Sequence, residues 1–161
     1  MKAITGVLVA GLALVGAPAG VAAQGADDEA AVLQVVNDLF DGMREKDGDK
    51  LRGVWHPEAR LQTAGATPEG AAQLGSTPVD GFVQGVLDAQ AFLDEVTFDE
   101  VVQISGRLAT VWAPYNLFVN DAFQHCGVDA IQMIRTADGW KIFQLTDTRT
   151  REGCDPERRD L

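Results

Sequence analysis

The chain contains 161 residues, 46% of them hydrophobic, and carries a formal net charge of −11 at pH 7. A chain of this length can bury the core of one domain without metals or many disulfides. The acidic balance makes nucleic acids and anionic membrane surfaces poor partners, because like charges repel.

The first 23 residues have the features of a secretory signal peptide. Lys2 precedes an apolar run from Ile4 to Ala17, and small residues lead up to Ala23. A membrane anchor is the alternative, but it needs about 20 apolar residues, and a proline and a glycine interrupt this run. We therefore expect cleavage after Ala23 and export to the periplasm or the medium. Residues 24–161 would then form a single domain without a membrane span.

An amphipathic helix is predicted after this segment, since apolar residues recur at the spacing of one helix face. Asp27 or Asp28 suits its N-terminal cap, and Gly48 is placed to end it in a left-handed conformation. A second, short helix is expected over residues 49–55, before a His-Pro pair. The buried stripe of the first helix comprises Val32, Val35, Val36, Leu39, Phe40 and Met43.

The middle of the chain gives weaker signals. A short strand is predicted over residues 60–63. Residues 64–76 are rich in glycine, alanine and threonine without a usable period, so we interpret them as a loop. Thr77 and Pro78 suit the cap and first position of a third helix. Its apolar face comprises Val79, Phe82, Val83, Val86 and Leu87.

Four long strands are predicted in the second half, where apolar residues alternate between turn signals. They cover residues 96–104, 107–119, 123–135 and 140–150. The sequence therefore predicts helices followed by a mainly antiparallel sheet, which is an α+β arrangement.

The last turn sets the register of the final hairpin. Ala137-Asp138-Gly139 fits a three-residue turn with a left-handed glycine, which places Thr136 opposite Trp140. Asp129 would then face Asp147, with His125 on the same side of the sheet, and Cys126 would face Thr150 on the other side. A shift of one residue would exchange the two faces.

The chain has two cysteines, Cys126 and Cys154. In an exported protein they are expected to form an internal disulfide, because oxidising compartments preserve such bonds. The alternatives are two separate buried thiols or a bridge between two chains. An internal bond requires the tail after Arg151 to fold back over the sheet.

Several strings in this order resemble a known family. A short helix ending in Trp-His-Pro, the string HCGVDAIQMIRTADGWKI from His125 to Ile142, and REGC ending at Cys154 are similar to the exported bacterial "putative lumazine-binding" proteins of the nuclear transport factor 2-like (NTF2-like) superfamily. The resemblance covers about residues 30–154. It implies a cone-shaped fold, in which a curved sheet encloses a cavity closed by the first helix. It also implies a homodimer contact on the outer face of the sheet.

The resemblance and the residue types together predict a pocket for a small, ring-containing organic ligand. Histidine and carboxylate groups in such a pocket can bind polar groups or move protons. Two facing aspartates would raise each other's affinity for a proton, whereas Arg149 and Arg151 are placed to neutralise them. The predicted pocket residues are Trp55, His56, Tyr115, His125, Asp129 and Asp147.

Each of these residues also has a structural interpretation. His56 suits the end of a helix, the aromatic side chains suit a core, and the acids with the arginines suit a polar network. Metal-binding spacings such as HxH or HExxH are absent, so we expect neither a metal nor a cofactor. The function hypotheses are an exported ligand-binding protein, an isomerase, dehydratase or cyclase with acid–base chemistry, and a structural or partner-binding module.

Overall fold

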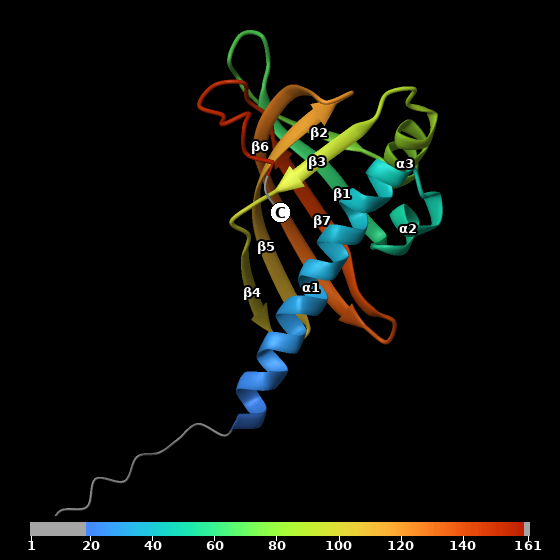
Figure 1. Ribbon diagram of the computed structural model, residues 1–161, viewed down its shortest axis with the longest axis vertical. Coiled ribbons are helices and arrows are strands. Elements are labelled where there is room, and N and C mark those ends of the chain that lie inside the picture. The colour runs from blue at the N-terminus through green and yellow to red at the C-terminus, as the bar shows by residue number, and fades with distance from the viewer. Residues whose placement is uncertain (1–18, 160–161) are drawn as a thin grey trace, which may run out of the picture.

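The computed structural model describes residues 19–159, which form three helices and one seven-stranded sheet (Figure 1). In chain order the elements are α1 (Ala19–Glu45), α2 (Gly48–Gly53), β1 (Trp55–Ala66), β2 (Ala72–Thr77), α3 (Val79–Asp88), β3 (Leu93–Thr97), β4 (Val101–Ser105), β5 (Leu108–Val119), β6 (Ala122–Thr136) and β7 (Gly139–Thr148). The strand order is β2-β1-β7-β6-β5-β3, and β4 also pairs with β5. Only the pairing of β1 with β7 is parallel among the described strands. The predicted α+β class is therefore confirmed.

The predicted export segment falls mainly outside the described residues. α1 begins at Ala19 and runs through the predicted cleavage point, so the predicted caps Asp27 and Asp28 lie inside the helix. Signal cleavage stays a prediction. Between residues 19 and 159, no helix is both long enough and apolar enough to span a membrane.

The turn between α1 and α2 differs from its prediction. Lys46, with a φ of 55°, takes the left-handed conformation that we assigned to Gly48. Gly48 is instead the first residue of α2, because Asp47 caps that helix by accepting hydrogen bonds from the backbone of Asp49 and Lys50, both at 3.0 Å. The aspartate cap thus moves the chain reversal two residues earlier than expected.

The hairpin of β1 and β2 corrects the prediction of a short strand followed by a loop. β1 extends from Trp55 to Ala66, and β2 pairs with it in antiparallel register from Leu61 opposite Thr77 to Ala66 opposite Ala72. Every residue of β2 is exposed. Because neither face of β2 is buried, its residues do not alternate between apolar and polar, and this stretch has no sequence pattern typical of a strand.

The prediction of one strand over residues 96–104 is also wrong, because this part of the chain contributes to two strands. β3 ends at Thr97 and β4 starts at Val101. Asp99, with a φ of 50°, bends the chain between them without reversing its direction. Both strands pair with β5, one after the other along its length.

The final hairpin keeps its predicted register near the two aspartates although its turn is one residue shorter. Thr136 pairs with Gly139 rather than opposing Trp140, which leaves a two-residue turn. A β-bulge then inserts Phe143 between the pairs on either side. The bulge restores the predicted alignment, so Asp129 faces Asp147. Cys126 faces Thr150, with which it forms an isolated antiparallel β-bridge.

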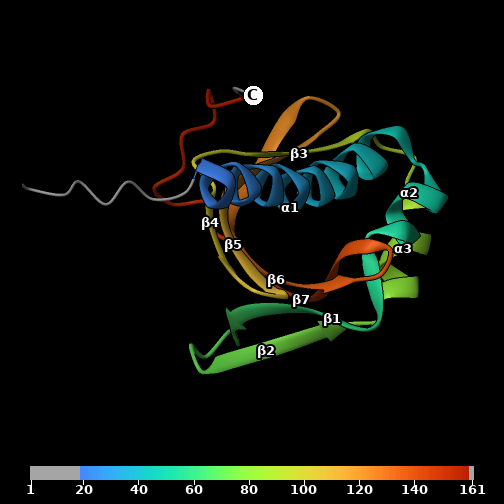
Figure 2. The same cartoon turned by 90° about the horizontal axis from the view of Figure 1, so that it is seen from below.

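The main core lies between α1 and the concave side of the curved sheet, as Figure 2 shows. Alternate residues of the strands point into it, which explains the predicted alternation. α3 contributes two further buried valines. Buried core residues include Val32, Val36, Leu39, Phe40, Val83, Val86, Ala109, Val111, Ala113, Ile131, Met133 and Ile142.

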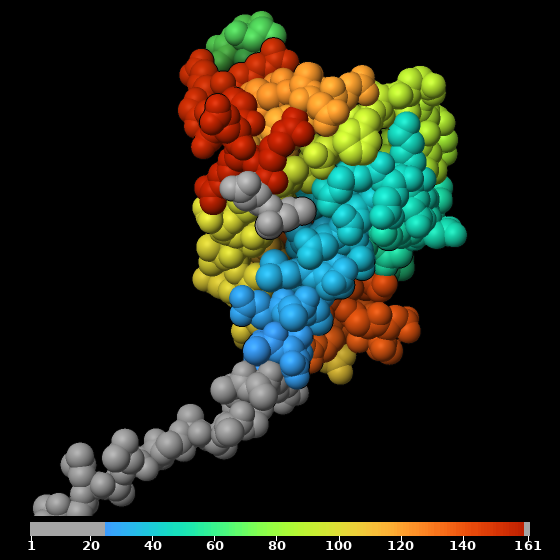
Figure 3. All heavy atoms as spheres, in the orientation of Figure 1, coloured from blue at the N-terminus to red at the C-terminus, as the bar shows by residue number. Residues whose placement is uncertain are grey.

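Residues 150–159, which we call the C-terminal strap, fold back over the outer face of the sheet. Cys126 and Cys154 form the predicted internal disulfide. The amide of Asn116, fully buried on β5, donates hydrogen bonds to the carbonyls of Asp155 and Arg158, both at 2.8 Å. The strap lies on the surface of the molecule (Figure 3).

Two arginines hold the end of the strap. The Arg158 guanidinium stacks 4.2 Å from the ring of Phe98. That of Arg159 stacks 3.7 Å from the ring of Phe118, which is only 1% exposed. Phe118 is therefore buried under the strap, whereas Trp112 on the same strand face is 55% exposed.

Candidate functional site

A cavity of about 70 Å³ lies between α1 and the concave face of the sheet. Its lining combines an apolar floor with ionisable groups on one side. A larger groove of about 530 Å³ lies on the outer face, but its lining residues are mostly exposed. The smaller cavity is the candidate site because two of its carboxyl side chains, those of Asp129 and Asp147, are almost fully buried. It is lined by Leu39, Phe40, Met43, Trp55, Leu61, Phe82, Glu95, Asp129, Leu145, Asp147 and Arg149.

Three of the predicted pocket residues meet in this cavity. Trp55 is the first residue of β1 and packs edge-to-face against Phe82, with ring centroids 6.2 Å apart. Asp129 and Asp147 are paired neighbours on β6 and β7, and both are almost fully buried. Their side chains share the concave face because paired residues on adjacent strands point the same way.

Tyr115 and His125 lie beside the cavity without lining it. Their rings pack edge-to-face with centroids 5.7 Å apart. The Tyr115 hydroxyl donates a hydrogen bond to the carbonyl of Thr148 at 2.9 Å. Burial, together with the nearby positive charge of Arg149, lowers the pKa of His125, so its ring is mainly neutral at neutral pH.

His56 is not brought together with the other predicted residues. It lines the groove on the outer face with Glu58 and Arg60. Its Nδ1 accepts a hydrogen bond from the backbone N–H of Glu58 at 3.2 Å. This contact matches the structural interpretation, in which His56 helps the chain turn past Pro57.

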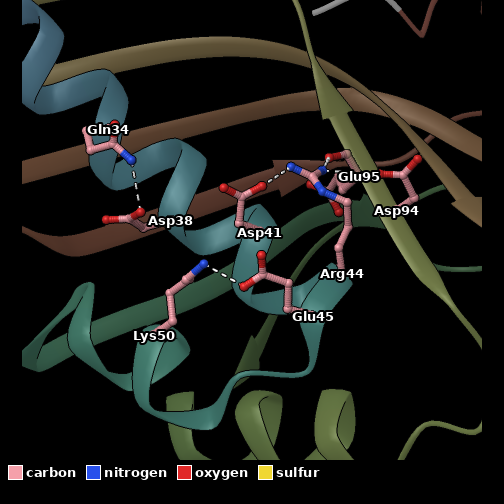
Figure 4. A network of polar contacts seen from close by, with 8 residues as sticks. All are labelled: Gln34, Asp38, Asp41, Arg44, Glu45, Lys50, Asp94 and Glu95. Carbon is pink, nitrogen blue, oxygen red and sulfur yellow. Dashed lines mark hydrogen bonds and ion pairs between the residues drawn. The ribbon is translucent and has the colours of Figure 1, made fainter.

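Glu95 on β3 is a site residue that sequence reasoning missed. Its backbone carbonyl accepts a hydrogen bond from Arg44 of α1 at 3.0 Å, and Arg44 also binds Asp94 at 3.2 Å and Asp41 at 2.5 Å (Figure 4). Arg44 therefore fixes β3 against α1 and leaves the Glu95 side chain facing the cavity. To predict the position of Glu95, the segment would have had to be recognised in the sequence as two strands, β3 and β4.

Glu95 and Asp129 hold protons more tightly than ordinary carboxyl groups. Burial raises the pKa of Glu95 to about 7, although its hydrogen bond with Asp129 opposes the rise. Burial also raises the pKa of Asp129 well above its usual value, and the charge of Glu95 raises it further. The negative charge of Asp147 also raises the pKa of both carboxyl groups. Two touching carboxyl groups ionise together only at high cost, so the pair retains at least one proton near neutral pH.

The two nearby arginines do not neutralise both aspartates, which corrects that expectation. The Nε of Arg149 donates to Asp147 at 2.5 Å. The Nε of Arg151 instead donates to the carbonyl of Gln124 at 2.9 Å. Asp129 therefore has Glu95 as its hydrogen-bonded neighbour, while the charge of Arg149 acts on it without a direct contact.

Three buried polar atoms at the cavity lack a hydrogen-bond partner among the described residues. They are Nε1 of Trp55, Oδ2 of Asp129 and Oδ1 of Asp147. These residues are 7%, 2% and 5% exposed. Leaving such an atom unpaired costs roughly 1–3 kcal/mol. A bound molecule could satisfy them with one acceptor and two donors.

Within residues 19–159, no three histidine, cysteine or acidic side chains are arranged to hold a metal ion. The predicted absence of a metal or cofactor stays a prediction. The chemistry that this chain itself offers is hydrogen bonding and proton transfer by the carboxyl groups.

Replacing Glu95 with glutamine is expected to raise stability more at about pH 8 than at about pH 5. Between the ordinary pKa of 4.5 and the raised value of about 7, the folded protein keeps a proton that the unfolded chain has lost. The free energy of unfolding therefore falls as pH rises through this window, and the glutamine variant lacks this loss. Urea unfolding should give a difference on the order of 1 kcal/mol between the two pH values. Glu58→Gln, at an exposed position, should show no such difference, and an equal gain at both pH values for Glu95→Gln would contradict the prediction.

Solved NTF2-like structures share this fold at low sequence identity. An NTF2-like protein with a cystatin-like fold from Novosphingobium aromaticivorans is 13% identical, with a TM-score of 0.65 over 86% of this chain and 92% of that chain. A function-unknown protein from Mycobacterium tuberculosis is 14% identical, with a TM-score of 0.66 over 88% of this chain and 82% of that one. A "Putative Scytalone Dehydratase" from Novosphingobium aromaticivorans is 9% identical, with a TM-score of 0.64 over 80% and 88%. Likenesses this distant establish the fold alone.

The sequence itself matches a family. A search of curated proteins gave no match. The model of the family described as "Putative lumazine-binding" matches residues 27–146, which include α2, all but the start of α1, and every strand except the end of β7. Since this match covers most of the chain, the protein belongs to the Putative lumazine-binding family, and it has an NTF2-like fold.

Proposed function

We propose that this protein binds a small, ring-containing organic molecule in the cavity between α1 and the sheet. The observation that carries the proposal is the set of unpaired buried atoms on Trp55, Asp129 and Asp147 around an otherwise apolar space. Ligand pockets typically combine an apolar lining with a few placed polar groups, and they have volumes of about 300–1,000 Å³. The cavity of about 70 Å³ must therefore widen when a ring enters it. The family description also favours a small ligand.

The residue composition of the lining supports a ring-containing ligand. Phe40, Trp55 and Phe82 contribute aromatic surface, and Leu61 and Leu145 contribute aliphatic surface. Aromatic side chains pack well against other rings. A ring with N–H donors and a carbonyl acceptor would complement both the floor and the polar side of the cavity.

Homodimer formation and export are part of the same proposal. Exposed apolar side chains on β4, β5 and β6 support a second copy of the chain as a partner at the outer face, because a large exposed apolar patch usually marks an interface. The disulfide supports an oxidising compartment. The apolar patch comprises Val101, Leu108, Trp112 and Ile134, which are 37–55% exposed.

Native mass spectrometry of the protein purified from an oxidising compartment tests these points together. We expect a dimer that carries a discrete excess mass, and we expect this mass to vanish on denaturation. The denatured chain should begin near Gln24 and lack two thiol hydrogens. An empty protein that also binds no member of a ring-fragment library would contradict the binding function, and a monomer would contradict the dimer.

A matched pair of tryptophan variants ties the excess mass to the cavity. Trp55→Phe removes the unpaired Nε1 donor while keeping an aromatic ring in the cavity. Trp112→Phe makes the same change at an exposed position on the outer face. The ligand should be depleted in Trp55→Phe and retained in Trp112→Phe. Equal retention in both variants would place the ligand elsewhere.

Acid–base catalysis is the second candidate function. It is favoured by the contact between Glu95 and Asp129, since a carboxyl group with a pKa of about 7 can both give and take a proton at neutral pH. An isomerase, dehydratase or cyclase would use such a pair. Conversion of the released ligand by the wild-type protein, lost in Asp129→Asn with folding intact, would support catalysis over binding alone.

A further inference from the structure

The cavity has an excess of acidic groups that its own basic group does not balance. Three carboxyl side chains line it, from Glu95, Asp129 and Asp147, but Arg149 is the single basic residue of the lining. Arg149 is already engaged with Asp147. Arg44, the nearest cation of α1, is engaged with Asp41 and Asp94. Glu95 and Asp129 therefore have no cation of their own within the cavity.

Two unpaired carboxylate oxygens also indicate that the cavity lacks a positively charged hydrogen-bond donor. Oδ2 of Asp129 and Oδ1 of Asp147 can each accept a hydrogen bond, and no N–H or hydroxyl donor of the described residues reaches either. The two residues are paired neighbours on β6 and β7, and side chains at such positions lie about 4.5–5.5 Å apart at Cβ. One group with two or more N–H donors can thus contact both carboxylates.

We propose that the cavity selects ligands that present a positively charged N–H group, such as an amidinium or a primary ammonium, over neutral and anionic molecules of the same shape. This inference rests on the proposed ligand-binding function and narrows its ligand class. The cation would lie between Asp129 and Asp147, and the remainder of the ligand would lie on the apolar floor. Burial strengthens such a charge-assisted contact relative to one on the surface.

Binding of a cation should displace the proton that the acidic pair retains. The titratable and charged groups around Glu95 are Asp129 of β6, Asp147 of β7, Arg149 just after β7, Tyr115 of β5 and Arg44 of α1. The acidic members of this set favour the protonated form of Glu95, whereas the two arginines oppose it. A bound amidinium adds one more opposing charge. Its affinity should therefore rise with pH until Glu95 is ionised.

Three flat probes of the same shape and different charge test the inference on the wild-type protein. Benzamidine is a cation, benzamide is neutral and benzoate is an anion. By calorimetric titration at about pH 8 and physiological ionic strength, we expect benzamidine to bind at least about tenfold more tightly than benzamide. Benzoate should bind more weakly still. From about pH 8 down to about pH 6, the affinity for benzamidine should fall, by at most about tenfold per pH unit for one displaced proton.

Charge-neutral substitutions locate the effect. Glu95→Gln and Asp129→Asn should each reduce the preference for benzamidine over benzamide, and Glu95→Gln should also flatten the pH dependence. Glu58→Gln removes an exposed carboxylate from the outer groove and serves as the control for long-range attraction. It should leave the preference unchanged. If a cavity variant fails to fold by circular dichroism, the three-probe comparison on the wild-type protein still decides.

The possible outcomes separate this inference from the binding function beneath it. Equal affinities for benzamidine and benzamide, or tighter binding of benzoate, would overturn the cation preference and leave ligand binding standing. A resident ligand in the native mass spectrum without any benzamidine binding would also overturn the cation preference and leave ligand binding standing. Failure of all three probes together with an empty native protein would overturn both.

Discussion

Replacing Gly127 with alanine is expected to lower the free energy of unfolding by about 3 kcal/mol or more. A Cβ atom at this position would lie 1.8 Å from the carbonyl oxygen of Thr148 and 2.8 Å from Cε1 of Tyr115. Neither neighbour can give way easily, because the same carbonyl accepts the buried Tyr115 hydroxyl. The backbone of β7 would have to move away from β6, next to Asp147 of the cavity.

Urea unfolding of Gly127→Ala and Gly65→Ala measures this effect. Gly65 also lies in a strand, but a Cβ there would meet nothing within 4 Å. Its replacement should change the free energy of unfolding by less than about 0.5 kcal/mol. Near-wild-type stability of Gly127→Ala would show that β6 and β7 are not in such close contact.

Loss of the disulfide is expected to cost about 3–4 kcal/mol, because the bond joins residues 28 positions apart and restricts the unfolded chain. The double variant Cys126→Ala with Cys154→Ala would also free the C-terminal strap. The amide of Asn116 would lose its two carbonyl partners, and Phe118 would lose its cover. Thermal and urea unfolding of the oxidised wild type and the double variant measure the loss.

A reductant provides the internal control for this prediction. It should lower the stability of the wild type toward that of the double variant and leave the double variant unchanged. Hydrogen exchange should increase at Asn116 and Phe118 in the double variant, because the strap covers them. A double variant with wild-type stability and unchanged exchange would contradict a stabilising strap.

The facing of Asp129 and Asp147 was predicted correctly from sequence, although the turn on which that prediction rested was different. The predicted turn was one residue too long, yet the bulge at Phe143 restored the alignment. Since neither the shorter turn nor the bulge has a clear sequence signal, the prediction was correct through two compensating differences. Trp55 lines the cavity as the first residue of β1 rather than as the end of the short helix.

Glu95 and His56 show where sequence reasoning fell short. The side that a strand residue faces depends on register, and the register of β3 against β5 depends on the unpredicted break at Asp99. His56 faces outward because it is one position after Trp55, the cavity-facing first residue of β1. A step of one residue along a strand reverses the face. Tertiary pairing, rather than local propensity, decided both positions.

The parallel pairing of β1 with β7 makes assembly of the cavity a late event in folding. Trp55 pairs with Ile142 and Thr63 with Asp147, so the two sides of the site are more than 80 positions apart in sequence. Such distant contacts require a large loss of chain entropy before they form, and they slow folding. On a ribosome, or on any route that delivers the chain from its N-terminus, α1 and the β1–β2 hairpin would wait with exposed apolar surface for the last strand. Protection of that surface by a chaperone until β7 arrives would then govern the yield of folded protein.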